Sequence, residues 1–246
     1  GTMVDHDNEM TAEVRDAIRA VHDAGVEVVI STGRSVPGVL NAADKLDLDG
    51  DAVASNGSVV MSYRPVEILH QVTFDASEAV TRIVEQLPDA LVAVEEIGVG
   101  YRVSKPFPSG EINGDMTVHP IEDLIAEPVT RVIIRSPEHS AEDFHRIVAD
   151  LGLADTNYYV GYTAWLDLAP EGVSKASGLE VLCERRGLTA ADVLAVGDGN
   201  NDIEMLRWAG RGVAMGQAPD SVKAVADAVT GPIEADGLAD ELRRYL

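Results

Sequence analysis

Hydrophobic positions along the chain follow two spacings, one typical of amphipathic helices and the other of short buried strands. Apolar residues three or four positions apart predict helices over 11–24 and 36–46, and nearly continuous apolar runs predict strands over 26–30 and 51–55. Gly25 follows the first helix and favours its end. Strands that alternate with helices are typical of a parallel sheet built from strand–helix–strand units.

The pattern changes in the middle of the chain and returns near residue 170. Strand-like runs on either side of a Pro-containing turn predict a hairpin over 58–73, and a Pro- and Gly-rich loop is expected over 105–114. We therefore predict an α+β domain over 58–169, inserted into a discontinuous core formed by 1–57 and 170–246. The core is expected to be an α/β domain with a doubly wound parallel sheet, Rossmann-like in architecture.

Composition adds a strong negative charge to this picture. The 246 residues include 42 Asp and Glu but only 19 Lys and Arg, for a formal net charge of −23. Such a charge repels phosphate backbones, so we expect no nucleic-acid partner, and an anionic ligand would need cations at its own site. No apolar run reaches the roughly 18 residues of a membrane span, and no secretory signal is visible. We expect a cytoplasmic protein with no membrane partner; its oligomeric state is not readable from the pattern.

One glycine-rich turn carries the strongest chemical signal. Directly after a strand-like run, residues 195–206 read Ala-Val-Gly-Asp-Gly-Asn-Asn-Asp-Ile-Glu-Met-Leu. We expect Asp198 and Asp202 at the carboxyl end of a strand, beside helix-start N–H groups that bind anions. Mg²⁺ takes oxygen ligands and usually binds through one or two carboxylates plus substrate phosphate. An acidic cap on an ordinary strand–helix turn would use the same residue types, so the turn by itself leaves both interpretations open.

Polar residues also follow two other predicted strands. Thr32 and Gly33 come directly after one strand and Asn56 after the next, at positions where open α/β sheets bind ligands. We assign Gly33, Arg34 and Asn56 to substrate binding, although Arg34 could equally be a surface charge. Lys175 is expected at a helix start, where a cation opposes the helix dipole. We expect it to meet a bound phosphoryl group or an acidic side chain.

Taken in order, these motifs resemble those of haloacid dehalogenase (HAD) superfamily phosphatases, in the Cof-type branch with a large C2 cap. Ser-Thr-Gly-Arg over 31–34 is similar to the second family motif, Gly-Val-Ser-Lys over 172–175 to the third, and the segment 197–206 to the fourth. Two later segments, 212–223 and 236–238, are also similar to the family. The predicted insert lies where the family carries its cap.

The resemblance implies a Mg²⁺-dependent phosphomonoester hydrolase that works through an aspartyl-phosphate intermediate. It implies that Thr32 holds the phosphoryl group and that Lys175 bridges this group and the nucleophile. Asp198 would ligate Mg²⁺. Asp202 would support the metal directly or through water, and Asn201 would orient nearby groups. The implied substrates are small phosphorylated metabolites such as sugar phosphates.

The first family motif reads Asp-x-Asp-Gly-Thr, and only its last two residues are similar to Gly1 and Thr2. We expect the nucleophile, the acid/base and the central strand of the sheet to precede residue 1. Asp5 and Asp7 follow the Gly-Thr pair in a polar stretch with no apolar strand before them. We interpret these two aspartates as solvated residues.

Two other functions stay open on the sequence alone. If residue 1 were the true start, the chain would be a non-catalytic protein that binds phosphorylated metabolites. A phosphomutase-type phosphotransferase on the same scaffold would pass the phosphoryl group to a sugar hydroxyl instead of to water. An upstream Asp-x-Asp separates the first alternative from a hydrolase, and analysis of the reaction product separates the second.

Overall fold

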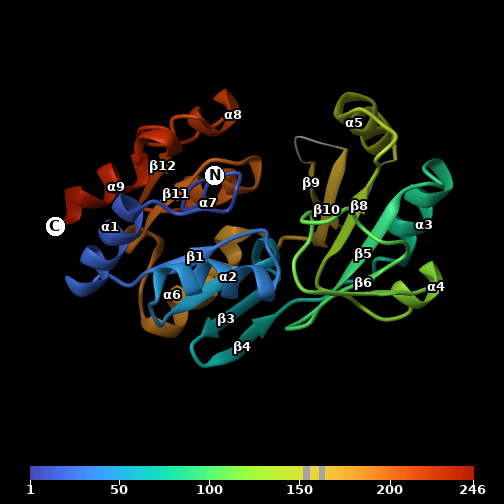
Figure 1. Ribbon diagram of the computed structural model, residues 1–246, viewed down its shortest axis with the longest axis horizontal. Helices are drawn as coiled ribbons and strands as arrows, with labels where there is room; N and C mark the ends of the chain where they lie inside the picture. The colour runs from blue at the N-terminus through green and yellow to red at the C-terminus, as the bar shows by residue number, and fades with distance from the viewer. Residues whose placement is uncertain (152–155, 161–163) are drawn as a thin grey trace. The chain divides into compact units, whose positions relative to one another are not determined.

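The computed structural model describes residues 1–151, 156–160 and 164–246 (Figure 1). Contacts between Cα atoms divide the chain into two compact units. Unit 1 comprises Gly1–Gly33, Val39–Leu69 and Ser174–Leu246, and unit 2 comprises Arg34–Gly38 and His70–Val173. Unit 1 corresponds to the predicted core, and unit 2 to the predicted insert.

Unit 1 contains a four-stranded sheet whose strands lie in chain order. The strands are β1 (Val29–Ser31), β2 (Asp51–Ala54), β3 (Val59–Tyr63) and β4 (Val66–Gln71). β1 and β2 are parallel, as the sequence predicts, whereas β3 runs antiparallel to β2. Because β3 pairs with β2, residues 58–69 group with unit 1, although the sequence pattern assigned them to the insert. The contact units therefore begin the main part of the insert at His70.

A second sheet of unit 1 has three strands and is parallel throughout. In order across the sheet, the strands are β11 (Leu194–Gly197), β12 (Arg211–Ala214) and β13 (Ala228–Val229). A helix connects each strand to the next, so these are the expected strand–helix–strand units. Among the described residues, β1 and β11 each have a paired strand on one side only. The central strand expected between them stays a prediction.

The core of unit 1 lies where helices pack against its two sheets. The helices of the core segments are α1 (Ala12–Asp23), α2 (Val36–Leu46), α6 (Lys175–Arg186), α7 (Ile203–Trp208), α8 (Asp220–Lys223) and α9 (Gly237–Leu242). Short 3₁₀ turns lie at Ser55–Gly57, Ala190–Asp192, Asn200–Asp202, Ile233–Ala235 and Arg243–Tyr245. Buried side chains from both sheets and from α6 and α7 form one cluster, which includes Val53, Val60, Leu179, Ala195 and Leu206. This shared core fixes the ends of β2 and β11 relative to the start of α6.

Unit 2 is built on a six-stranded sheet. In order across the sheet, the strands are β7 (Asp115–Val118), β6 (Gly100–Val103), β5 (Leu91–Glu96), β8 (Val132–Arg135), β10 (Trp165–Pro170) and β9 (Thr156–Val160). All pairs are antiparallel except β6 with β7. Its helices are α3 (Ser77–Gln86), α4 (Ile121–Leu124) and α5 (Ala141–Asp150). The mixed content confirms the expected α+β character of the insert.

The sheet of unit 2 is covered by apolar side chains on both faces. One cluster is formed by buried side chains of the helices and of the sheet face they cover, among them Ile83, Phe144 and Leu166. A second cluster includes Phe107 and Ile112, which belong to the predicted loop over 105–114. Phe107 packs edge-on against Trp165 with ring centroids 6.3 Å apart. The predicted loop is therefore a packed part of this unit.

Candidate functional site

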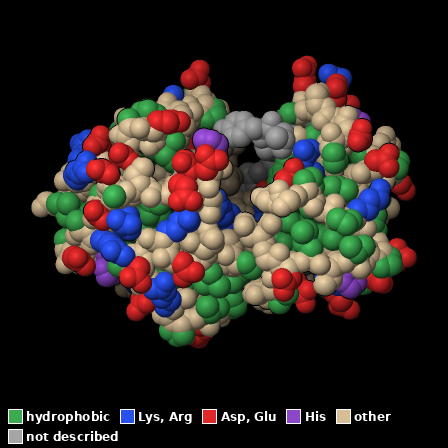
Figure 2. All heavy atoms as spheres, in the orientation of Figure 1, with side chains coloured by type: hydrophobic (Ala, Val, Ile, Leu, Met, Phe, Trp, Pro, Cys, Tyr) green, Lys and Arg blue, Asp and Glu red, His purple; other side chains and the backbone are tan. Residues whose placement is uncertain are grey.

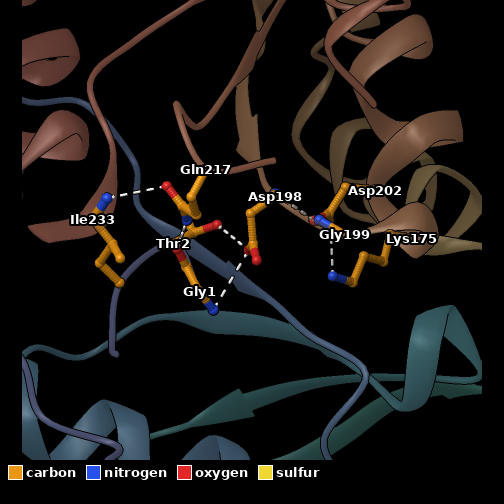
Figure 3. Close-up of polar contacts among 8 residues, drawn as sticks. All are labelled: Gly1, Thr2, Lys175, Asp198, Gly199, Asp202, Gln217 and Ile233. Carbon is orange, nitrogen blue, oxygen red and sulfur yellow. Dashed lines mark hydrogen bonds and ion pairs between the residues drawn. The ribbon is translucent and has the colours of Figure 1, made fainter. Parts of the chain in front are cut away.

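Asp198 directly follows β11, at the carboxyl end of the strand. The Thr2 hydroxyl donates a hydrogen bond of 2.7 Å to Asp198 Oδ1, and the Gly1 nitrogen lies 3.5 Å from the same oxygen. The Asp198 side chain is 27% exposed, so its carboxylate is reachable from solvent. Figure 3 shows Gly1, Thr2 and Gln217 to one side of Asp198, and Lys175 with Asp202 to the other.

Lys175 and Asp202 form a buried ion pair beside Asp198. Lys175 Nζ lies 2.5 Å from Asp202 Oδ1, and both side chains are less than a tenth exposed. The other carboxylate oxygen of Asp202 accepts the backbone N–H groups of Asp198 and Gly199, at 2.8 and 2.9 Å. Three donors thus compensate one buried carboxylate, which is the condition for burying an ion pair at tolerable cost.

Two effects oppose each other at the Asp202 carboxyl. Burial by itself raises the pKa of Asp202, but the charge and hydrogen bond of Lys175, with the N–H groups of Gly199 and Asp198, hold this pKa below its ordinary value. The Asp202 carboxyl is therefore ionised at neutral pH. Because its oxygens are engaged by these donors, the arrangement favours indirect support of a metal over direct ligation, the two roles that the sequence left open.

Local sequence explains how this pair is placed. Ser174 and Ser177 form a capping box at the start of α6: the Ser177 hydroxyl accepts from the Ser174 N–H at 2.9 Å, and the Ser174 hydroxyl accepts from the Ser177 N–H at 3.4 Å. Lys175 is thereby fixed as the first residue of the helix. The acidic partner expected for a cation at a helix start is Asp202. At the end of β11, residue 197 must be glycine, because a Cβ there would lie 2.6 Å from the Asp202 Cγ atom.

Three further predicted residues meet from three different turns. Asn201 Nδ2 donates to Asn56 Oδ1 at 2.9 Å. A Cβ on Gly33 would lie 2.9 Å from Asn56 Oδ1 and 3.3 Å from Asn201 Nδ2, so only glycine fits against this amide pair. Asn56 is buried and has a φ of +56°, a conformation that Asn adopts more readily than most residues.

Backbone hydrogen bonds fix the turn that carries Thr32. The Thr32 N–H donates to the Val53 carbonyl at 2.8 Å, and the Thr32 carbonyl accepts from the Asn56 N–H at 3.2 Å. Thr32 therefore extends the pairing of β1 with β2 to the edge where Asn56 lies. Arg34 groups with unit 2, and burial lowers the pKa of its guanidinium. Its substrate role stays a prediction.

Thr2 and Gln217 contact this site without having been predicted. Gln217 Nε2 donates to the Gly1 carbonyl at 2.6 Å, and Gln217 Oε1 accepts from the Ile233 N–H at 3.0 Å. Gln217 lies within 212–223, one of the segments that resembles the family, which is the signal by which it could have been found. Its contact with Gly1 spans 216 residues of chain, and no local pattern reports such a pairing.

The residues present fit a hard divalent cation. Among the described residues, no three His, Cys, Asp or Glu side chains gather in a metal-binding group. A partly exposed Asp198 carboxylate, in a turn predicted to bind phosphate, matches the way Mg²⁺ is usually held, by one or two carboxylates with substrate phosphate and water. Asp198 is the residue that would hold the ion, and Asp202 would keep the turn in place.

Comparison with known proteins assigns the chain to a family. It belongs to the haloacid dehalogenase-like hydrolases, whose family model matches residues 1–242. The phosphoglycolate phosphatase of Natronomonas pharaonis is 30% identical over 251 residues, which cover 99% of this chain and 93% of that protein. The 5-amino-6-(5-phospho-D-ribitylamino)uracil phosphatase YitU of Bacillus subtilis is 26% identical over 261 residues, covering 100% and 94%.

Solved structures agree with this assignment. A Bacteroides thetaiotaomicron protein described among the phosphatases of the haloalkanoate (HAD) enzyme superfamily has a TM-score of 0.81 and 26% identity to this chain. The match covers 100% of this chain and 91% of that one. The predicted family, fold class and class of enzyme, a phosphatase, are therefore confirmed. No helix in the described part of the chain is long and apolar enough to cross a membrane, and the cytoplasmic location stays a prediction.

Proposed function

We propose that the protein is a Mg²⁺-dependent phosphomonoester hydrolase that acts on small phosphorylated metabolites, with sugar phosphates as the first class to test. The reaction breaks the P–O bond to the alcohol and transfers the phosphoryl group to water, releasing the alcohol and inorganic phosphate. The observation that carries this proposal is the buried Lys175–Asp202 pair next to the accessible Asp198 carboxylate. Lys175 can neutralise a bound phosphate, and the neighbouring Asp198 carboxylate can hold the metal ion that accompanies it.

Each residue has a distinct part in the proposed reaction. Lys175 neutralises the phosphoryl oxygens and forms an ion pair with Asp202. Thr32 and Gly33 bind these oxygens through donor groups on the turn after β1. Asp198 holds Mg²⁺, which when bound offsets the repulsion between carboxylates and phosphate. Local cations are needed here because the chain as a whole, with a net charge of −23, repels an anionic substrate.

The amide pair has an orienting part in the same proposal. Asn201 and Asn56 hold each other at 2.9 Å and keep the turns after β2 and β11 at a fixed separation. Gly33 lies directly against this pair. We assign Asn56 to the substrate side and Asn201 to fixing the metal-binding turn, so that the phosphoryl group and the cation are presented together.

The nucleophile of the proposed reaction is inferred from the family resemblance. The resemblance assigns the nucleophile and the acid/base to aspartates directly before the Gly-Thr pair that is similar to Gly1 and Thr2. The contact of Thr2 with Asp198 supports this assignment, because it brings that segment to the proposed metal ligand.

Substrate choice is to be tested with a panel. Relatives are named as phosphatases of phosphoglycolate and of a phosphorylated ribitylaminouracil, and we propose substrates of similar size. The natural protein is assayed with p-nitrophenyl phosphate, hexose phosphates and phosphoglycolate, in Mg²⁺ and in EDTA. Phosphate release that EDTA abolishes and Mg²⁺ restores supports the proposal. No release with Mg²⁺, or transfer of the phosphoryl group to a sugar without release, contradicts it.

A further inference from the structure

Two segments that resemble the family have no part in the proposed reaction. They are 212–223, which includes most of β12 and all of α8, and 236–238, which lies after β13. The segments meet through the connection between them: the Gly216 N–H donates to the Gly231 carbonyl at 3.1 Å, and the Thr230 hydroxyl donates to the Gly237 carbonyl at 2.6 Å. Both segments therefore form one connected loop region.

Gln217 extends from this loop region to the first residues of the chain. Its side-chain amide uses both of its ends: the nitrogen donates to the Gly1 carbonyl at 2.6 Å, and the oxygen accepts from the Ile233 N–H at 3.0 Å (Figure 3). Gln217 is exposed, so neither bond is needed to compensate burial. The bond to Ile233 fixes the direction of the amide, and the amide nitrogen is thereby presented to Gly1.

The contact of Gln217 with Gly1 is linked to Asp198 through the next residue in the chain, Thr2. Thr2 follows Gly1 and donates to Asp198 Oδ1 at 2.7 Å, so the position of the Gly1 backbone determines where the Thr2 hydroxyl lies. The loop region is held independently of this contact. Ser221 donates to Asn200 Oδ1 at 3.1 Å, which ties the loop to the turn that carries Asp198.

We propose that Gln217 is a positioning residue, which holds the Gly1–Thr2 segment against Asp198 and thereby sets the affinity of the site for its divalent cation. The proposal rests on the proposed function, in which Asp198 is the metal ligand. Gln217 itself touches neither substrate nor cation. Its removal lets the Thr2 hydroxyl leave Asp198, and the carboxylate then loses the donor that orients it.

Two variants separate the hydrogen bond to Gly1 from the presence of a side chain. Gln217→Met keeps the length of the side chain and removes both hydrogen bonds. Gln217→Glu keeps an acceptor for the Ile233 N–H but has no donor for the Gly1 carbonyl. The added charge of Glu attracts cations, so weaker cation binding in this variant reports the lost hydrogen bond. Gln86→Met, at the exposed end of α3, is the matched control.

The measurement is the Mg²⁺ dissociation constant by titration calorimetry on the natural full-length protein, together with kcat as a function of Mg²⁺ concentration. We expect Gln217→Met to bind Mg²⁺ about fivefold more weakly, the effect of one lost hydrogen bond, and to regain wild-type kcat at saturating Mg²⁺. A residue that only stabilises the loop lowers the melting temperature and leaves the Mg²⁺ dissociation constant unchanged.

An affinity of Gln217→Met within twofold of wild type overturns the proposal, and so does a loss of kcat that saturating Mg²⁺ does not restore. If Gln217→Met does not fold, Gln217→Ala, which also lacks both hydrogen bonds and adds no charge, decides: weaker Mg²⁺ binding supports the positioning role, and unchanged binding overturns it. Failure of the proposed function gives a different result, because the wild-type protein then shows neither Mg²⁺ binding nor Mg²⁺-dependent phosphate release.

Discussion

At the residue scale, the proposed phosphate site depends on the ion pair of Lys175 with Asp202, because the chain as a whole is acidic. Both side chains are buried, and each lowers the cost of burying the other. Lys175 is one of only four lysines. In the proposed function, its position at the start of α6 meets two demands, a charged partner for Asp202 and a cation for the substrate.

Replacing Lys175 tests both demands at once. Lys175→Met should lower kcat at least a hundredfold, because the phosphoryl group loses its cation. It should also lower the free energy of unfolding by roughly 3–5 kcal/mol, because a buried carboxylate is left without its charged partner. Phosphate release and urea unfolding measure the two effects. Lys223→Met, on α8, should change neither, and wild-type turnover in Lys175→Met would remove Lys175 from the site.

The lowered pKa of Asp202 predicts a pH dependence of stability. A carboxyl whose pKa is lower in the folded state contributes stability above its unfolded pKa, and this contribution is lost as the pH falls through the folded pKa. The ordinary value for Asp is 3.8. The free energy of unfolding of the wild type should therefore fall more steeply below about pH 4 than that of Asp202→Asn. Parallel curves for the two proteins in urea unfolding at pH 2.5 to 7 would contradict the pairing.

At the scale of secondary-structure elements, the cap of α6 decides where Lys175 lies. Ser174 begins this helix with a capping box, and Ser140 caps α5 by accepting from the Asp143 N–H at 3.1 Å. The two caps are alike in chemistry, but the first helical residue after each differs. Only the residue after Ser174 belongs to the proposed site.

This likeness gives a matched pair of variants. Ser174→Ala and Ser140→Ala should each lower the free energy of unfolding by about 1 kcal/mol, the usual cost of a lost N-cap. Only Ser174→Ala should also lower kcat, by roughly tenfold, because Lys175 is no longer fixed at the first position of the helix. Urea unfolding and phosphate release measure the two effects. Equal kcat in both variants would show that the cap does not position Lys175.

Elements with a clear burial pattern were predictable from the sequence. The predicted helix at 36–46 agrees residue by residue with α2, because it buries a periodic apolar face. β7 was missed because all four of its residues are exposed, so it carries no alternation. α4 was missed because it is only one turn long. The hairpin of β3 and β4 and the strand β2 were each predicted, but the pairing of β3 with β2 was not.

Site residues were likewise predictable where a local sequence signal marks them, and not where their contacts depend on how distant segments fold together. Gly33 and Asn56 were predicted because each follows a strand, at the end of a parallel sheet where ligands bind, and Asn201 was predicted from the family resemblance. The role of Asp202 as the partner of Lys175 was one of two interpretations that the helix dipole left open. The Gln217 contact with Gly1 depends on how the loop after β12 folds back, and residue type alone does not report that.

At the scale of the whole molecule, the net charge of −23 sets the conditions under which an anionic substrate arrives. Figure 2 shows Asp and Glu side chains spread across the face in view. Charges exposed in this way act over about 10 Å at 0.1 M salt and over longer distances at lower salt. In the proposed function, an anionic substrate would therefore meet a repulsive field before it reached Lys175.

This field predicts an unusual dependence on salt. At saturating Mg²⁺, kcat/KM for an anionic phosphomonoester should rise, by about twofold to tenfold, as NaCl increases from 10 to 300 mM, because salt screens the repulsion. Initial rates at low substrate concentration measure this quantity. A steady fall of kcat/KM over this range would mean that local cations, and not the net charge, dominate the approach of the substrate.

The central claim is that Asp198 holds the Mg²⁺ on which hydrolysis depends. The most direct test is the rate of phosphate release as a function of Mg²⁺ concentration for the wild type and for Asp198→Asn, with Asp220→Asn at the start of α8 as the control. We predict that Asp198→Asn loses at least 99% of the activity at limiting Mg²⁺ while it stays folded, and that Asp220→Asn follows the wild type. Near-normal activity of Asp198→Asn at limiting Mg²⁺ would contradict the account.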